Sequence, residues 1–264
     1  MSLFISHGSP MMVIEESPAR RFLRQWSDKL QRPEAILVAS AHWESRQGVL
    51  VSLSGKPETI HDFGGFPEEL YDIGYDAKGA PDVAHLAIDL LQAAGFDVHA
   101  VPDRGLDHGA WAPLSLMYRD ADIPVCQVSL IRGVSPRDHY RMGLALKSLA
   151  DKGVLVIGSG SMTHNLREYM GRRLEDPAPG WVTEFEDWMK EALESNRLED
   201  LFDYRALAPH AVRNHPTEEH LLPLFFALGA AGEKAAAVRV HSSHSHGVIS
   251  MDMYSFSSQG KGNA

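Results

Sequence analysis

The stretch Val154-Leu155-Val156-Ile157 opens directly into Gly158-Ser159-Gly160-Ser161-Met162-Thr163-His164. Four consecutive apolar residues, three of them β-branched, predict a short strand of a parallel sheet that is covered on both faces. The Gly- and Ser-rich segment predicts the end of that strand and places His164 just beyond it. Ligands bind at the carboxyl ends of strands in open α/β sheets. The stretch therefore predicts a site at one edge of such a sheet.

Apolar runs of this kind recur along the chain and alternate with helical patterns. Predicted strands cover residues 3–5, 35–41, 49–53, 96–101, 125–131, 154–157, 236–240 and 248–256. Predicted helices cover residues 20–30, 83–94, 136–150 and 181–193, and a last helix runs toward residue 228, with Ser17, Asp82 and Thr217 as N-caps. This alternation predicts an α/β fold: a single domain with a central, mostly parallel or mixed sheet covered by helices on both faces. We expect this domain to span residues 1–256 and the segment 257–264 to be a disordered tail.

The composition excludes several classes of protein. The chain has 264 residues, with 25 Lys and Arg against 35 Asp and Glu, and a net charge of −10. This acidity argues against a partner that is nucleic acid or an anionic membrane. No apolar run approaches the ~20 residues that span a bilayer. The N-terminus lacks the pattern of a signal peptide, so we expect a cytoplasmic protein.

The counts of cysteine and histidine point to one kind of chemistry. Cys126 is the only cysteine and lies in a predicted strand, where we expect a buried thiol. A disulfide scaffold and a Cys-based zinc site are therefore excluded. The 14 histidines are unusually many, and imidazole serves both as a metal ligand and as an acid–base group near neutral pH.

Four histidines are candidates for one site. His7 and His42 lie at the ends of predicted strands, on the same side as the apolar residues that precede them, and His164 follows a third strand. His220 is predicted in the first turn of the helix capped by Thr217, where the helix dipole favours the neutral imidazole that binds metal. A single histidine at a strand end is more often a structural residue, but three such positions together with His220 favour a metal site.

The remaining histidines carry weaker signals. His61 and His108 lie in segments rich in Gly and aromatic residues, which suit either a functional loop or a simple turn. The tract from His241 to His246 can bind metal adventitiously, and the sequence indicates no native role for it. We expect four more to lie on solvated or partly buried faces of helices and strands: His85, His99, His139 and His210. Motifs for dinucleotide binding, a phosphate loop and a serine nucleophile elbow are absent from the sequence.

Six short motifs occur in order along the chain: Ser6-His7-Gly8-Ser9-Pro10, Ser40-Ala41-His42-Trp43, Ile60-His61-Asp62-Phe63-Gly64-Gly65-Phe66-Pro67, Asp107-His108-Gly109, Thr163-His164-Asn165-Leu166 and Pro216-Thr217-Glu218-Glu219-His220-Leu221-Leu222-Pro223-Leu224. Together they resemble the 4,5-DOPA extradiol dioxygenase family, within the class III (LigB-like) aromatic ring-opening dioxygenases. Each motif is weak alone, but six in order over most of the chain are specific.

The resemblance implies an extradiol dioxygenase that opens the ring of a catechol such as DOPA with O2. It implies that His7, His42 and His220 hold a metal at the sheet edge. It makes His164 the acid–base residue and a possible further metal contact. His108 is implied as a catalytic or substrate-contacting residue, and His61 and Phe63 as part of the substrate loop.

The metal implied by the resemblance is non-haem Fe(II), but the ligand set also suits Zn(II). Better-known class III enzymes use two His and a Glu, whereas the matching position here is His220, with Glu219 beside it. Two alternatives therefore stay open: a zinc-dependent hydrolase and a non-catalytic zinc-binding member of the superfamily. The expected partners are a small catechol and O2, and we expect a monomer or a small homo-oligomer.

Overall fold

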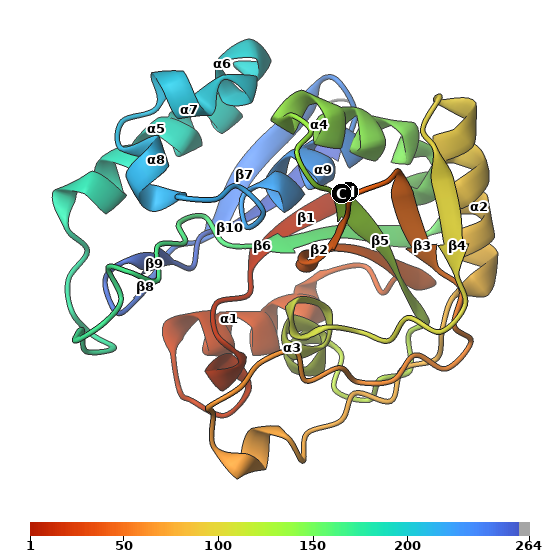
Figure 1. The fold of residues 1–264 in the computed structure, drawn as a ribbon, viewed down its shortest axis with the longest axis horizontal. Coiled ribbons are helices and arrows are strands. Elements are labelled where there is room, and N and C mark those ends of the chain that lie inside the picture. Colours follow the sequence, from red (N-terminus) through yellow and green to blue (C-terminus); the bar gives the residue numbers. More distant parts are fainter. Residues whose placement is uncertain (259–264) are drawn as a thin grey trace.

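Four parallel strands form the centre of the sheet in the computed structural model, which describes residues 1–258 (Figure 1). The eight strands of this sheet follow the order β4-β3-β5-β2-β6-β1-β10-β7. The central strands are β5 (Val125–Ile131), β2 (Ala35–Ser45), β6 (Val154–Gly160) and β1 (Ser2–Ser6). They are flanked on one side by β3 (Val49–Ser52) and β4 (Val98–Val101), and on the other by β10 (Met253–Ser258) and β7 (Ala235–His241).

Antiparallel pairs at both sides make the sheet mixed. β3 runs antiparallel to β5, and β10 runs antiparallel to both β1 and β7. A separate short hairpin pairs β8 (His244–Ser245) with β9 (Ile249–Ser250). The register places Ser6 beside Gly160 and Ser40 beside Ser159. The carboxyl ends of β1, β2 and β6 therefore meet at one edge.

Helices cover both faces of the sheet (Figure 1). α1 (Pro18–Trp26) and α3 (His108–Met117) pack on one face, below the sheet in the figure, and α2 (Pro81–Ala93), α4 (Pro136–Ala145) and α9 (Leu222–Ala230) on the other. Side chains alternate along a strand, so Leu3 and Ile5 enter one core while Phe4 enters the second. The other helices are α5 (Gly180–Glu194), α6 (Leu198–Phe202), α7 (Tyr204–Leu207) and α8 (Ala211–Asn214), with short 3₁₀ turns at Pro10–Val13, Ser27–Lys29, Glu68–Leu70 and Lys147–Lys152. The predicted α/β class is confirmed.

Glycines in β6 let α9 approach the sheet closely. A Cβ atom on Gly158 would lie 1.9 Å from the carbonyl oxygen of Pro223, and one on Gly160 would lie 2.0 Å from that of His220. Only a residue without a side chain fits such a contact. The backbone N–H of Ser161 also donates to the His220 carbonyl over 2.8 Å. This packing positions His220 at the end of β6.

Two predicted helix starts are wrong. Thr217 is not an N-cap, because α9 begins at Leu222 and His220 lies in the turn that precedes it. Asp82 is not an N-cap either, because α2 begins one residue earlier, at Pro81. In both cases a proline lies within the first turn of the helix. A backbone N–H has no intrahelical partner at this position, so proline, which lacks that N–H, is well suited to it.

Several other boundaries also differ from the expectations. The predicted strand 248–256 is divided into β9 and β10. Ser257 and Ser258, which were assigned to the tail, are the last residues of β10, and the rest of the predicted tail lies outside the described residues. Cys126 is buried in β5 as expected, and burial raises the pKa of its thiol to about 12. Within residues 1–258, no helix is long and apolar enough to cross a membrane.

Candidate metal centre

Three histidines from distant parts of the chain meet at the sheet edge. His7 follows β1, His42 lies near the end of β2, and His220 lies just before α9. Each offers one ring nitrogen, and these three nitrogens all lie within 4.8 Å of one another. The Nε2 atoms of His7 and His42 are 3.0 Å apart. The three residues therefore have the spacing of ligands around one ion.

The ring of His7 is oriented by Ser159 at the end of β6. The Ser159 hydroxyl donates a short hydrogen bond to the carbonyl oxygen of Gly109. Its oxygen is then free to accept from His7 Nδ1, which lies 3.0 Å away. With its proton on Nδ1, His7 presents the lone pair of Nε2 to His42. The serine thus selects the tautomer that can bind a metal.

Carboxylates lie beside the other two rings. His220 Nδ1 lies 3.1 Å from Glu219 Oε1, and His42 Nδ1 lies 3.5 Å from Asp62 Oδ2. Protons on these Nδ1 atoms leave Nε2 of both rings available. Three convergent lone pairs repel one another unless a cation lies between them. An all-imidazole donor set of this kind fits Fe(II) or Zn(II).

Burial keeps the three imidazoles neutral. It lowers the pKa of His7 well below its ordinary value, and the charges of neighbouring histidines lower it further. Burial and the neighbouring His108 lower the pKa of His42 to about 4. Burial also lowers the pKa of His220 to about 3, although Glu219 acts in the opposite direction. The neutral ring is the form that binds metal, so the cluster is poised for it at pH 7.

His164 lies against His220. The two rings stack with their centroids 3.5 Å apart and their planes at 8°. The loop after β6 carries His164, and its backbone N–H donates to the carbonyl oxygen of Asn214 over 3.0 Å. Burial lowers the pKa of His164, and Glu219 opposes this effect. One nitrogen of His164 also lies within 4.8 Å of ligand atoms of Glu219 and His220.

His108 is the first residue of α3 rather than part of a loop. Its ring centroid lies 3.9 Å from that of His42, and the residue is only 6% exposed. Asp62 Oδ1 accepts a 2.9 Å hydrogen bond from its backbone N–H and lies 2.9 Å from its Nδ1. The structure therefore places His108 directly beside a candidate ligand.

The loop that carries His61 and Phe63 closes over this side of the cluster. The ring of Phe63 meets that of His108 edge to face, with centroids 5.7 Å apart. His61 lies one ring further away, against Phe63 and Trp111, and its Nε2 is 3.0 Å from the carbonyl oxygen of Ile73. Both side chains are partly buried. Phe63 therefore borders the cluster, whereas His61 supports the wall behind it.

Three further residues of the site were not singled out from the sequence. Ser159 is hydrogen-bonded to His7, and Asp62 is hydrogen-bonded to His108. Asp107 is fully buried and accepts from Ser40 Oγ over 2.6 Å, as well as from Arg104 and Gln127. Asp62 stands between His61 and Phe63 in the motif of residues 60–67, and Ser159 shares a strand face with the buried Leu155 and Ile157. The partners that tie these residues to the site lie far along the chain, at 46 residues for Asp62, 152 for Ser159 and 67 for Asp107 with Ser40, so they cannot be inferred from the sequence.

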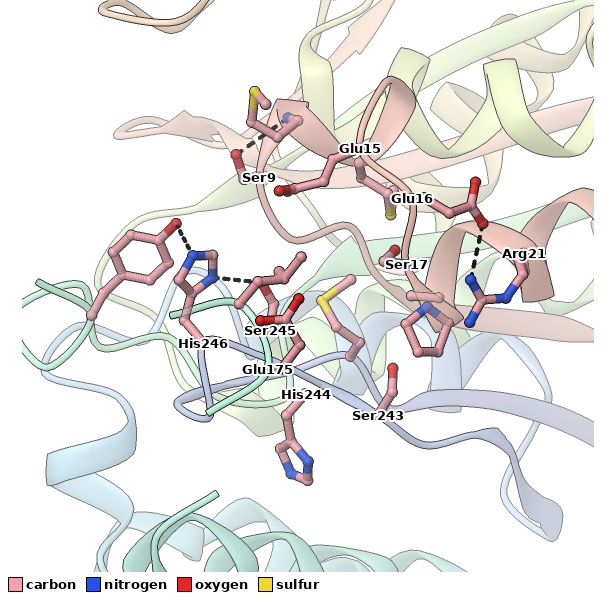
Figure 2. Close-up of a pocket in the computed structure, with 17 residues that line it drawn as sticks. Ser9, Glu15, Glu16, Ser17, Arg21, Glu175, Ser243, His244, Ser245 and His246 are labelled. Atoms are coloured by element: carbon pink, nitrogen blue, oxygen red, sulfur yellow. Dashed lines mark hydrogen bonds and ion pairs between the residues drawn. The ribbon is translucent and has the colours of Figure 1, made fainter. Parts of the chain in front are cut away.

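The other histidines do not join the cluster. His241, His244 and His246 have partners of their own in Ser243, Glu186 and Tyr169, and no potential metal-ligating group in residues 1–258 includes them. His244 and His246 instead border a separate cavity of about 430 Å³, with Glu15, Glu16 and Arg21 on its other side (Figure 2).

His139 departs from the expectation of a solvated or partly buried position. It is fully buried, with Nδ1 3.0 Å from the carbonyl oxygen of Ser135. Its Nε2 accepts from the backbone N–H of Ile131 over 3.2 Å. Two backbone partners identify it as a structural residue between β5 and α4.

Comparisons with known proteins agree with this architecture. The family model described as the catalytic LigB subunit of aromatic ring-opening dioxygenase matches residues 1–255. The chain is 44% identical to a "4,5-DOPA dioxygenase extradiol" of Beta vulgaris, over 97% of this chain and 96% of that protein. It is 39% identical to a protein of the same name from Escherichia coli (strain K12), over 87% and 84% of the two chains.

A solved structure shares the fold. The crystal structure of the uncharacterized protein JW3007 from Escherichia coli K12 superimposes with a TM-score of 0.80 at 32% identity, covering 96% of this chain and 98% of that one. These matches confirm the resemblance that the six motifs carry. The chain belongs to the LigB family of aromatic ring-opening dioxygenases, and its relatives class it as an extradiol dioxygenase.

Proposed function

We propose that the protein opens the ring of a catechol such as DOPA with O2, and that His7, His42 and His220 hold a non-haem Fe(II). The observation that carries this proposal is the convergence of three neutral imidazoles within 4.8 Å at the sheet edge. Relatives from beet, Mirabilis jalapa and Escherichia coli that are named 4,5-DOPA dioxygenase extradiol support the class of substrate. The proposal includes a cytoplasmic location, with which a single buried thiol is compatible.

The metal and the residue His164 have different roles in the proposed reaction. When bound, ferrous iron supplies a Lewis acid that lowers the pKa of the catechol hydroxyls and a common point of attachment for substrate and O2. His164 has a lowered pKa and is neutral at pH 7, so its ring nitrogen can accept a hydroxyl proton from the substrate and later return it. Stacking on His220 holds that ring beside the centre.

The opposite wall suits a flat aromatic ring. Phe63 presents its ring next to His108, and Trp111 lies behind it with centroids 6.4 Å apart. Aromatic side chains favour edge-to-face or offset contacts with another ring. We assign Phe63 to substrate binding, His61 to the same substrate loop as the residue that supports the Phe63 ring, and His108 to contact with a substrate oxygen.

Zinc is the second metal that the donor set favours. Three histidines without a carboxylate ligand are also the ligand set of catalytic zinc sites. A zinc-dependent hydrolase and a non-catalytic zinc-binding protein are therefore the alternatives that the experiment must separate.

The test is anaerobic reconstitution with Fe(II), addition of L-DOPA or another catechol, and admission of O2. We expect stoichiometric oxygen uptake at an oxygen electrode and a yellow ring-opened product. The Zn(II)-loaded protein and the Fe(II)-treated His7→Ala variant serve as controls and should show neither signal. Hydrolytic activity of the zinc form without O2, or metal binding without any oxygen uptake, would overturn the proposal.

A further inference from the structure

The carboxylate of Asp62 is shared between two histidines of the centre. Oδ1 accepts from the backbone N–H of His108 and faces its Nδ1, both over 2.9 Å. Oδ2 lies 3.5 Å from Nδ1 of His42. The two rings are themselves in contact, with centroids 3.9 Å apart. One side chain therefore faces the Nδ1 atom of a candidate metal ligand and that of its neighbour.

Asp62 belongs to the loop that carries His61 and Phe63, so it connects His42 and His108 to that loop. It stands between His61 and Phe63, and Phe63 packs on His108. The Asp62 side chain is 23% exposed, so its carboxylate is partly hydrated. It therefore does not need these partners to compensate for complete burial of its charge. A carboxylate that accepts a hydrogen bond from the Nδ1–H group of a ligating histidine sets the orientation and basicity of that ring.

A purely structural role must be distinguished from this one. Because His108 is the first residue of α3, Asp62 also satisfies one of the free N–H groups at that helix terminus. The side chain of Asp107, at the N-cap position, makes no capping bond. Loss of Asp62 could therefore act through helix stability alone, and the test has to separate the two effects.

We propose that Asp62 is a positioning residue that orients His42 and His108 together, so that both present Nε2 to the metal and substrate. This inference rests on the proposed function for the role of His108, and on the three-histidine metal site for that of His42. It predicts that metal affinity depends on the negative charge of Asp62, and not only on the hydrogen bond that Asp62 accepts from the first residue of α3.

The test compares Asp62→Asn with the wild-type protein, using Co(II) alone as the probe. The Asn side chain still accepts from the His108 N–H but carries no charge. We expect Co(II) affinity, measured by competition with a chromophoric chelator, to fall about 10- to 100-fold. The visible Co(II) spectrum at saturation should also change, because the His42 ring is no longer held in one orientation.

Ser135→Ala is the matched control. Ser135 caps α4 through a 3.2 Å bond from Asp138 N–H, and its hydrogen bonds are to Asp138 and His139 rather than to a candidate ligand, so its loss weakens a helix terminus without removing a partner of the cluster. We expect this variant to lower the melting temperature but to bind Co(II) like the wild type. Wild-type affinity and spectrum in Asp62→Asn would overturn the proposal, and so would equal losses of Co(II) affinity in both variants. If the wild-type protein opens no catechol while Asp62→Asn still weakens Co(II) binding, the proposed function fails and the role toward His42 stands.

Discussion

Each of the three candidate ligands has a different partner beside its Nδ1 atom. His7 has the hydroxyl of Ser159, His42 has Asp62, and His220 has Glu219. A neutral partner and two anions differ in how strongly they raise the basicity of the ring. The asymmetry means that the three histidines are not equivalent, although the sequence presents them as the same residue type.

His164 is the residue whose replacement best separates proton transfer from metal binding. Its ring lies on His220 without being one of the three closest ligands, so His164→Ala should retain most of the metal. Removal of an acid–base group typically costs 10²- to 10⁴-fold in turnover. We expect a loss of that size in kcat, measured by oxygen uptake, with near-stoichiometric iron by metal analysis.

His7→Ala is the comparison for this prediction, because it removes a ligand and should abolish metal retention. Normal turnover in His164→Ala would contradict the acid–base assignment. Loss of metal in His164→Ala to the same extent as in His7→Ala would instead make His164 a ligand.

At the scale of elements, the contact between β6 and α9 positions one histidine of the candidate metal centre. Gly158 lies against the backbone of Pro223, and the carbonyl group of His220 lies over Gly160. Every residue of α9 is buried, so the helix cannot move away from the sheet without exposing apolar surface. The position of His220 is therefore set by how closely these two elements pack.

Gly158→Ala tests this dependence. Its Cβ atom would lie 1.9 Å from a backbone oxygen, which forces α9 to shift. Overpacking of this kind costs about 1–3 kcal/mol in the free energy of unfolding, measured by urea titration. We also expect weaker Co(II) binding, because His220 moves with the helix.

Gly55→Ala is the matched change for Gly158→Ala. A Cβ atom there would meet nothing within 4 Å, so the added methyl group should leave stability and Co(II) affinity nearly unchanged. Equal behaviour of the two variants would show that α9 does not depend on the glycine contact.

For the whole molecule, the cluster of neutral imidazoles makes stability depend on pH. His42 and His220 have pKa values of about 4 and about 3 in the folded protein, against about 6.5 in an unfolded chain. Between these values the unfolded chain binds more protons than the folded one, so the free energy of unfolding rises with pH. Acidification from pH 7 to pH 4.5 should therefore destabilise the metal-free protein.

The measurement is the urea midpoint of the chelator-treated protein at several pH values. Asp62 and Glu219 stay ionised between pH 7 and pH 4.5, so they do not change the pH dependence of stability in this range. Burial would raise the pKa of each, but hydrogen bonds and charge from His108 and His220 outweigh it and lower both to about 2. Their contribution is lost only below about pH 4. His7→Asn removes one buried imidazole and should reduce the slope, whereas a midpoint that stays constant or rises toward pH 4.5 would contradict the prediction.

Local patterns were sufficient for the class of fold and for most of its elements. The run at residues 154–157 forms the first part of β6, and the predicted strand at residues 125–131 forms β5 with the same bounds. Helix α3 was not predicted, since all its residues except Ser115 are buried and it has no polar face to create a period. α9 is also buried along its whole length, so no polar face in the sequence indicates where it begins.

The sequence by itself determined that histidines lie at or just beyond the ends of predicted strands, that imidazole is the available ligand, and that six motifs match one family. Only the tertiary structure decided the partners of His7 and His108, because Ser159 lies 152 residues from His7 and Asp62 lies 46 residues from His108. Alternation within a strand reports which face a side chain takes, but it carries no information about which strand lies beside it. Strand order and the close packing of α9 bring the ligands and their partners together, and these depend on contacts across the whole chain.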